Sequence, residues 1–180
     1  MKHLFLTGEK QIGKSTLIGK CLDGIGVPVS GFYTKKGIET DDHLYVHILK
    51  AGCDDSFRQD NILFDCRDRS EDAADRFNIL GCRILSEQPD AGLIIMDEIG
   101  YREQNADRFI GRVRELLDGD TPVFGVLRLC DRYPVTAIRA RDDVEIIEVT
   151  AENRDELANT LPVRLRKIIT EDSECQKDDQ

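Results

Sequence analysis

Short apolar runs alternate along the chain with stretches in which apolar residues recur every three or four positions. The runs predict buried strands, and the wider spacing predicts helices that bury one face. The predicted strands cover residues 3–7, 27–34, 44–49, 93–96, 122–127 and 144–149. The predicted helices cover residues 17–22, 70–84 (with Ser70 as the cap), 109–117 and 153–169. Strands that alternate with helices are typical of an α/β domain with a mostly parallel sheet.

The domain organisation follows from the absence of internal repeats and long linkers. We expect residues 1–170 to form a single domain, since 180 residues is an ordinary length for one. Residues 51–69 are polar and irregular apart from Ile62-Leu63-Phe64. Residues 171–180 contain five acids, one Lys and no aliphatic side chain, which predicts a solvated, disordered tail.

Composition excludes several classes of protein. The chain has 25 Lys and Arg against 35 Asp and Glu, a net charge of −10, which disfavours general nucleic-acid binding. The run at residues 93–96 is far too short to span a membrane, and the first residues do not resemble a signal peptide. The six cysteines form no CxxC pair and no zinc pattern with the three histidines. We therefore expect a cytoplasmic protein with reduced thiols and no membrane partner.

A phosphate-binding motif follows the first predicted strand and opens the first predicted helix. Residues 8–15 read Gly-Glu-Lys-Gln-Ile-Gly-Lys-Ser and match GxxxxGK[ST] in full. Gly8 and Gly13 permit a tight loop whose backbone N–H groups converge on phosphate oxygens. We expect Lys14 to reach the β- and γ-phosphates and the Ser15 hydroxyl to bind Mg²⁺. The loop residues in this site are Gly8, Glu9, Lys10, Gln11, Ile12, Gly13, Lys14 and Ser15.

Two acids, Asp97 and Glu98, end the most apolar predicted strand. We expect this strand to lie beside the first strand, so that Asp97 holds Mg²⁺ through water or through Ser15. Glu98 would then lie near the γ-phosphate, where it accepts a proton from an attacking water or orients it. Arg128 ends another predicted strand at the same edge of the sheet and is the best candidate to stabilise transition-state charge.

These residues leave more than one function open. A Glu directly after the metal-binding Asp favours hydrolysis of a nucleoside triphosphate by water. A nucleotide-dependent switch or binding module with incidental hydrolysis is an alternative, and so is a small-molecule or nucleotide kinase. Residues 128–133 could form a kinase lid, but no acceptor signature is present.

Taken together, these motifs resemble the THEP1-type nucleoside-triphosphatases, a family of small phosphate-loop proteins. The matching segments are residues 4–8 with 13–18, Gly-Phe-Tyr-Thr at 31–34, residues 95–100 with Glu103 beyond, and residues 150–154 with Leu161-Pro162 after them. The resemblance implies a three-layer α/β/α fold and slow, Mg²⁺-dependent hydrolysis of the terminal phosphate of ATP, GTP and other nucleoside triphosphates.

The resemblance also assigns roles to residues. It places Lys14 with Ser15 or Thr16 at the phosphates and metal, Asp97 at the metal and Glu98 as the base. Two positions depart from the family pattern: Gln11 stands where Gly is usual, and Tyr101 stands where a basic residue is usual. The sequence carries no signature of the preferred base, of a protein partner or of an oligomeric state.

Overall fold

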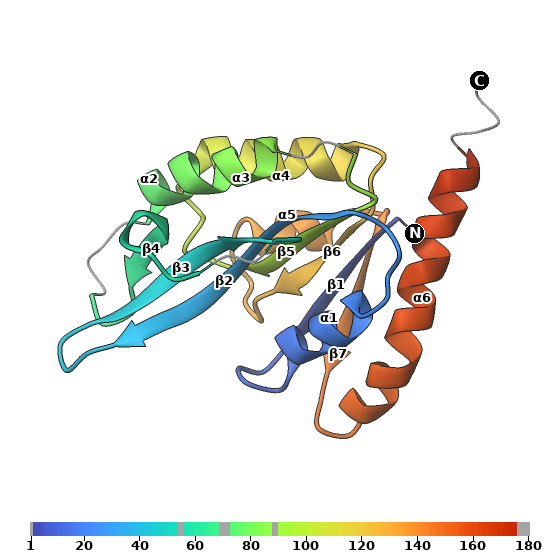
Figure 1. Ribbon diagram of the computed structural model, residues 1–180, viewed down its shortest axis with the longest axis horizontal. Helices are drawn as coiled ribbons and strands as arrows, with labels where there is room; N and C mark the ends of the chain where they lie inside the picture. Colours follow the sequence, from blue (N-terminus) through green and yellow to red (C-terminus); the bar gives the residue numbers. More distant parts are fainter. Residues whose placement is uncertain (1, 54–55, 69–72, 88–89, 176–180) are drawn as a thin grey trace.

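The computed structural model describes residues 2–53, 56–68, 73–87 and 90–175. Within them, seven strands form one sheet in the order β4-β3-β2-β5-β6-β1-β7 (Figure 1). The strands are β1 (His3–Gly8), β2 (Val29–Glu39), β3 (Leu44–Lys50), β4 (Ile62–Asp65), β5 (Leu93–Ile99), β6 (Val123–Leu127) and β7 (Val144–Val149). The predicted strands are all present, and β4 forms around the apolar triplet in the polar stretch.

Five adjacent strands, β2-β5-β6-β1-β7, run parallel, and β3 and β4 extend the sheet as antiparallel strands. The mostly parallel sheet is therefore confirmed. The prediction that β5 lies beside β1 is wrong, because β6 lies between them and pairs with both. All five residues of β6 are buried, and a strand that is apolar on both faces is stable in the middle of a parallel sheet.

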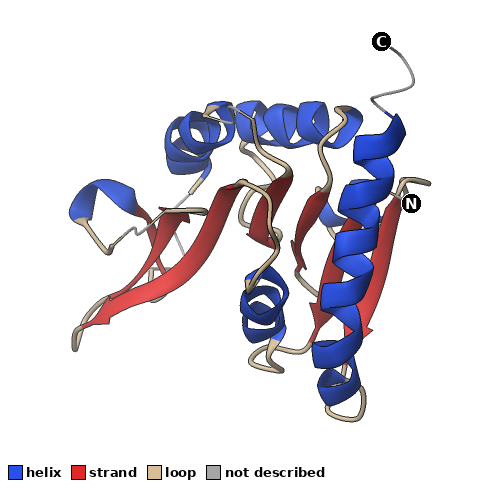
Figure 2. Cartoon of the chain, turned by 45° about the vertical axis from the view of Figure 1, so that its right-hand side comes forward, coloured by secondary structure: helices blue, strands red, loops and turns tan. Residues whose placement is uncertain are grey.

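Helices cover both faces of the sheet, as Figure 2 shows. Helices α1 and α6 pack together on one face, and α2 to α5 belong to the other face, so the three-layer α/β/α fold is confirmed. The helices are α1 (Lys14–Leu22), α2 (Ala74–Arg76), the π-helical turn η2 (Phe77–Gly81), α3 (Cys82–Ser86), α4 (Asp107–Asp118), α5 (Val135–Arg139) and α6 (Arg154–Cys175), with a 3₁₀ turn η1 (Gln59–Asn61). Helix α5 has no counterpart in the sequence prediction, because its single turn is too short for a helical period.

Each face of the sheet has its own apolar core. On one face the rings of Phe32 and Phe77 lie 5.7 and 5.2 Å from that of Phe109, measured between centroids. On the other face Ile18 of α1 and Leu165 of α6 pack in one buried cluster with the side chains of β1. Each fully buried Leu, Ile or Phe contributes about 1.5–3 kcal/mol. This second core fixes α1 on the sheet and so holds the phosphate loop at the end of β1.

The end of the chain differs in part from the sequence prediction. Helix α6 continues past Pro162 to Cys175, so residues 171–175 are helical although the sequence predicts a solvated tail from residue 171. No Gly or Pro follows Pro162 to stop the helix. Residues 176–180 and the predicted cap Ser70 lie outside the described residues.

Two of the compositional expectations can be compared with the described part of the chain. None of the helices there is both long enough and apolar enough to cross a bilayer. The five cysteines whose side chains are described are free thiols.

Candidate active site

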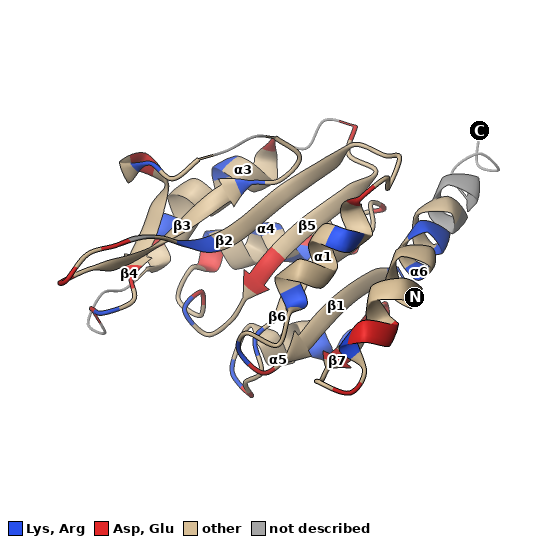
Figure 3. Ribbon diagram, turned by 60° about the horizontal axis from the view of Figure 1, so that its bottom comes forward, with Lys and Arg blue, Asp and Glu red and all other residues tan. Residues whose placement is uncertain are grey.

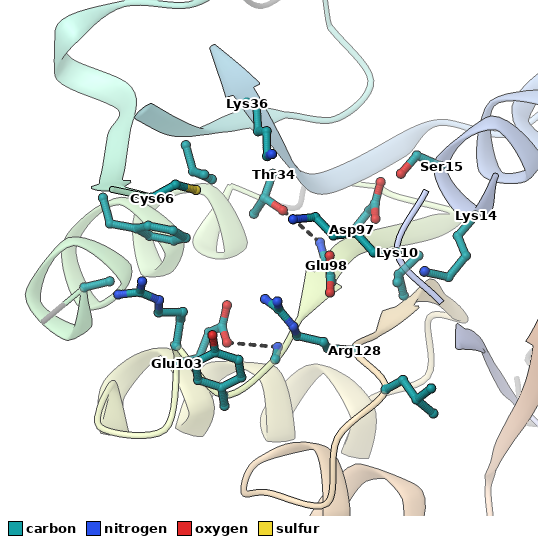
Figure 4. Close-up of a pocket in the computed structure, with 18 of the residues that line it drawn as sticks. Lys10, Lys14, Ser15, Thr34, Lys36, Cys66, Asp97, Glu98, Glu103 and Arg128 are labelled. Carbon is teal, nitrogen blue, oxygen red and sulfur yellow. Dashed lines mark hydrogen bonds between the residues drawn. The ribbon is translucent and has the colours of Figure 1, made fainter. Parts of the chain in front are cut away.

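The carboxyl ends of β1, β5 and β6 open into a cleft of about 1440 Å³. It is lined by the loop after β1, by the acidic end of β5 and by Arg128 after β6, all of them predicted site residues. Figure 3 shows this acidic strand end among basic segments of the chain. In Figure 4, Lys10, Lys14 and Ser15 lie on one side of Glu98, and Thr34 and Lys36 lie on another. Segments far apart in the sequence therefore meet at one edge of the sheet.

The phosphate loop is shaped by two glycines with positive φ. At Gly8, φ is 134°, and an added Cβ would lie 2.4 Å from the Val149 carbonyl oxygen of the neighbouring strand β7. At Gly13, φ is 109°, and this residue directly precedes the first turn of α1. At Gly8 any larger residue would collide with β7, and at Gly13 any other residue would be strained by the positive φ. The loop therefore delivers the start of α1 to the cleft.

Gln11 and Ile12 show how the loop accommodates residues other than glycine. Gln11 has a φ of 65° and an exposed side chain, so it adopts the left-handed conformation for which glycine is the usual residue. Ile12 points away from the cleft and packs against the core on the α1 side of the sheet. Of the predicted loop residues, Ile12 alone has no part in the cleft lining.

Lys14 folds back onto its own loop. Its ammonium group donates to the carbonyl oxygens of Gly8 at 2.9 Å and of Glu9 at 2.6 Å. Burial lowers the pKa of Lys14, Glu98 and Asp97 raise it, and Arg128 lowers it further. These influences mean that Lys14, the acidic pair and Arg128 share one electrostatic environment.

Asp97 is almost fully buried, with 3% of its surface exposed. The hydroxyl of Ser15 lies on the same side of the cleft and acts on the Asp97 carboxylate, although β6 separates β5 from β1 (Figure 4). Burial raises the pKa of Asp97 to about 6, and the charge of Glu98 adds to the rise, whereas the Ser15 hydroxyl and the charges of Lys14 and Lys35 oppose it. A buried carboxylate of this kind gains from a nearby cation.

Glu98 is held through its backbone by a residue of another strand. Its N–H donates to the hydroxyl of Thr34 on β2 at 3.2 Å (Figure 4). Thr34 belongs to the Gly-Phe-Tyr-Thr segment at residues 31–34. The sequence analysis identified this segment as a family match but did not predict the contact of Thr34 with Glu98. The contact arises because β2 and β5 pair in parallel, with Tyr33 opposite Asp97.

Arg128 is fixed both by its backbone and by its side chain. Its N–H donates to the carbonyl oxygen of Ile99 at 2.8 Å. Its guanidinium lies over the ring of Tyr101, with 4.8 Å from Cζ to the centroid, and Arg132 approaches the same ring at 5.5 Å. Cation–π contact orients a guanidinium without neutralising it. Tyr101, one of the two departures from the family pattern, thus contacts the guanidinium groups of both Arg128 and Arg132.

Comparison with known proteins identifies the family. The model of the NTPase family matches residues 3–161. The chain belongs to the NTPase family. A cancer-related nucleoside-triphosphatase homolog from Mus musculus is 30% identical, with 87% of this chain and 92% of that protein covered. A nucleoside-triphosphatase THEP1 from Methanosarcina acetivorans is 28% identical, with 93% and 99% covered.

Solved structures of NTPase-family members have the same fold. The crystal structure of THEP1 from the hyperthermophile Aquifex aeolicus matches with a TM-score of 0.70 and 26% identity, covering 88% of this chain and 96% of that one. The solution structure of a human cancer-related nucleoside triphosphatase matches with a TM-score of 0.64 and 27% identity, covering 93% and 98%. The resemblance expected from the sequence motifs is therefore confirmed over nearly the whole length.

One buried residue of this NTPase-family site had no role in the sequence prediction. Glu103 is 4% exposed, and its carboxylate accepts a hydrogen bond from the Gly100 N–H at 2.9 Å. Burial raises the pKa of Glu103 to about 7, the charge of Glu98 adds to the rise, and Arg128 opposes it. In the sequence, Glu103 appeared only as a position that matches the resembling family beyond residues 95–100, and no role was assigned to it.

Proposed function

We propose that this chain hydrolyses the terminal phosphoanhydride bond of ATP, GTP and other nucleoside triphosphates with Mg²⁺. One observation carries the proposal: Lys14 and Ser15 at the start of α1 share one cleft with Asp97 and Glu98 at the end of β5 (Figure 4). The relatives are named nucleoside-triphosphatases, which supports the same reaction here. A loop that binds phosphates and a carboxylate beside it are the parts that such a hydrolysis requires.

In this proposal the loop binds the phosphates. Backbone N–H groups of residues 9–16 donate to the phosphate oxygens, and α1 directs its positive dipole end at them. Lys14 exchanges its bonds to the Gly8 and Glu9 carbonyls for bonds to the β- and γ-phosphates. Since those bonds already hold the ammonium beside the loop, little reorganisation is needed when nucleotide arrives.

The residues at the metal position fit Mg²⁺. This ion prefers oxygen ligands and binds to proteins through one or two carboxylates together with substrate phosphates. Ser15 and Asp97 supply a hydroxyl and a buried carboxylate on the same side of the cleft (Figure 4). Among the described residues, no three or more His, Cys, Asp or Glu are placed to hold a metal ion together. In this proposal phosphate and water oxygens would complete the coordination. When bound, Mg²⁺ neutralises charge on the phosphates.

Glu98 and Arg128 carry the chemical step. Glu98 accepts a proton from water as the water oxygen bonds to the γ-phosphorus, and the bond from that phosphorus to the β–γ bridging oxygen breaks. The products are a nucleoside diphosphate and inorganic phosphate. Arg128 stabilises the charge that develops on the γ-phosphate oxygens. The Thr34 hydroxyl keeps the backbone of Glu98 in place for this role.

The test is phosphate release from ATP, GTP, CTP and UTP with Mg²⁺, for the wild type beside Lys14→Ala and Glu98→Gln. We expect Lys14→Ala to lose nucleotide affinity, and Glu98→Gln to retain affinity while kcat falls by about 100-fold or more. Lys20→Ala, an exposed lysine at the far end of α1, is the matched control and should behave as wild type. Full release by Glu98→Gln would reject Glu98 as the base.

The proposal extends to the organisation of the chain. Residues 1–170 act as one domain, the protein is cytoplasmic, and the substrate is a free nucleoside triphosphate. We expect limited proteolysis to cleave the chain only after residue 170, near the end of α6, and to leave phosphate release unchanged.

A further inference from the structure

The cleft continues past Glu98 into a second space that the phosphate loop does not reach. We call this space the distal compartment, and its lining includes Thr34, Lys36, Val46, Phe64, Cys66 and Arg102. Figure 4 shows Thr34, Lys36 and Cys66 on the side of Glu98 away from Lys14. Strands β2, β3 and β4 and the turn after β5 therefore build a part of the cleft that the residues assigned to the triphosphate do not line.

The size of the cleft leaves room for a second molecule. Sites for single small molecules usually measure about 300–1,000 Å³. This cleft measures about 1440 Å³, and the residues assigned to the triphosphate line only one end. Because Lys14 and Glu98 mark the terminal phosphate, the distal compartment lies beside that phosphate and beyond it.

The charges that line the cleft favour an anion. Among the described residues that line the cleft, six are Lys or Arg and four are Asp or Glu, whereas the whole chain has 25 against 35. Lys10, Lys14 and Arg128 lie at the end of the cleft that the proposed function assigns to the triphosphate (Figure 4). Lys36 and Arg102 are additional cations in the distal compartment.

Apolar surface accompanies these two cations. Phe64 and Val46 line the distal compartment, and the guanidinium of Arg102 lies over the Phe64 ring with 4.8 Å from Cζ to the centroid. Arg102 also has a further interaction partner, which a phosphate would share or replace. Since the ring keeps the guanidinium plane in place, that exchange costs little freedom. An aromatic group can pack on the same apolar wall.

We infer that the distal compartment binds a second small molecule, a planar aromatic compound that carries a phosphate group, beside the terminal phosphate of the nucleotide. Lys36 and Arg102 hold its phosphate, and Phe64 and Val46 contact its ring. The inference rests on the proposed function in one respect: the triphosphate must occupy the loop end of the cleft.

The test is calorimetric titration of the full chain after saturation with Mg²⁺ and the non-hydrolysable analogue β,γ-imido-ATP, so that the loop is filled. Adenosine 5′-monophosphate is the probe, and ribose 5-phosphate and adenosine are the same molecule without the base or without the phosphate. We expect the monophosphate to bind one site at least about tenfold more tightly than either fragment, which corresponds to about 1.4 kcal/mol.

Variants connect the binding to the residues. We expect Lys36→Ala and Arg102→Ala each to weaken binding of the monophosphate at least about fivefold, with the affinity for β,γ-imido-ATP changed less than about twofold. Arg114→Ala is the matched control, because the Arg114 guanidinium is also stacked on a ring, that of Tyr133, and neither residue lines the cleft. It should bind both compounds as wild type does.

The outcomes separate the two proposals. Analogue binding without saturable binding of the monophosphate would overturn the distal site alone. So would monophosphate binding that the Lys36 and Arg102 variants leave unchanged. Failure of the chain to bind β,γ-imido-ATP, measured first and without the monophosphate, would overturn the proposed function together with this inference.

Discussion

The carboxylate of Glu103 accepts a hydrogen bond from the backbone N–H of Gly100, with 2.9 Å between Oε2 and N. This bond closes the turn that follows β5, two residues after Glu98. The carboxylate is buried, so the bond is protected from water, and Glu98 and Arg128 act on its charge in opposite directions. A group outside the sheet therefore stabilises the chain segment that leads away from the proposed base.

Replacing Glu103 with Gln should change how stability depends on pH. The pKa of Glu103 is about 7 in the fold against 4.5 for an unperturbed Glu, so the folded chain binds more protons between these values. Its stability therefore falls as pH rises from 4.5 to 7. Glu103→Gln keeps an acceptor for Gly100 and removes the charge. The variant should gain about 3 kcal/mol relative to wild type between pH 4.5 and 7.5.

The measurement is urea unfolding of the nucleotide-free proteins across that pH range. Glu115→Gln, on the exposed side of α4, is the control and should follow the wild type. A constant difference between wild type and Glu103→Gln would show that the Glu103 carboxyl does not titrate in this window.

The Thr34 hydroxyl should matter for turnover more than for binding. Thr34→Val has nearly the same shape but leaves the Glu98 N–H without its acceptor. We expect kcat for phosphate release to fall about tenfold or more with KM little changed, because small displacements of a base are costly. Thr34→Ser retains the hydroxyl and should restore most of the rate. Equal rates for the Val and Ser variants would argue against this positioning role.

Arg128 and Tyr101 should act together on phosphate release. Arg128→Ala should lower kcat by about 100-fold if the guanidinium stabilises transition-state charge. Tyr101→Leu removes the ring under that guanidinium and should lower kcat by a smaller factor, whereas Tyr101→Phe keeps the ring and should behave as wild type. In a double-mutant cycle the effects of Arg128→Ala and Tyr101→Leu should not add. Additive effects would separate Tyr101 from the function of Arg128.

His3 should make the fold sensitive to acid. Its Nδ1 accepts a hydrogen bond from the Val123 N–H and its Nε2 donates to the Leu117 carbonyl oxygen, both at 3.0 Å, which requires a neutral ring. Burial lowers the pKa of His3 from 6.5 to about 4, Asp143 opposes this, and Lys2 and Arg141 add to it. The unfolded chain binds the extra proton, so stability falls as pH drops below 6.5.

His3→Gln removes this titration. Between pH 7 and pH 5 the wild type should lose about 2 kcal/mol of unfolding free energy more than the variant does. The variant will be less stable at pH 7, since it cannot reproduce both backbone contacts, and only the difference in slope is diagnostic. His43→Gln, a half-exposed histidine on another edge of the molecule, controls for general effects of losing an imidazole. Parallel pH profiles of wild type and His3→Gln would contradict the prediction.

Local patterns were enough to predict most of the elements. Leu93-Ile94-Ile95-Met96 predicted β5 and the spacing of Phe109, Ile110 and Val113 predicted α4, because burial imposes a period on the sequence. Strand order was not readable in this way. The pairing of β6 with both β1 and β5 is decided by which apolar strands fit together in the sheet.

In the candidate site, too, local motifs were predictable from the sequence and contacts between distant segments were not. The sequence predicted the loop from Gly8 to Ser15 and the Asp97–Glu98 pair as site residues from their short spacings, and all of them except Ile12 line one cleft in the structure. Thr34 and Glu103 were not assigned roles. Their contacts, with the Glu98 N–H and with the Gly100 N–H, depend on strand pairing and on a turn that no spacing rule encodes.

By itself the sequence determined the fold class, and it was enough to predict the phosphate loop and the acidic pair, because each of these patterns lies in residues that are close together in the chain. Only the tertiary structure decided that the Ser15 hydroxyl acts on Asp97 across an intervening strand, that Arg128 rests on Tyr101, and that the cleft extends to Lys36 and Arg102. The physical reason is that these relationships join segments from different strands. Their distances are set by sheet order and core packing, which many different sequences can satisfy.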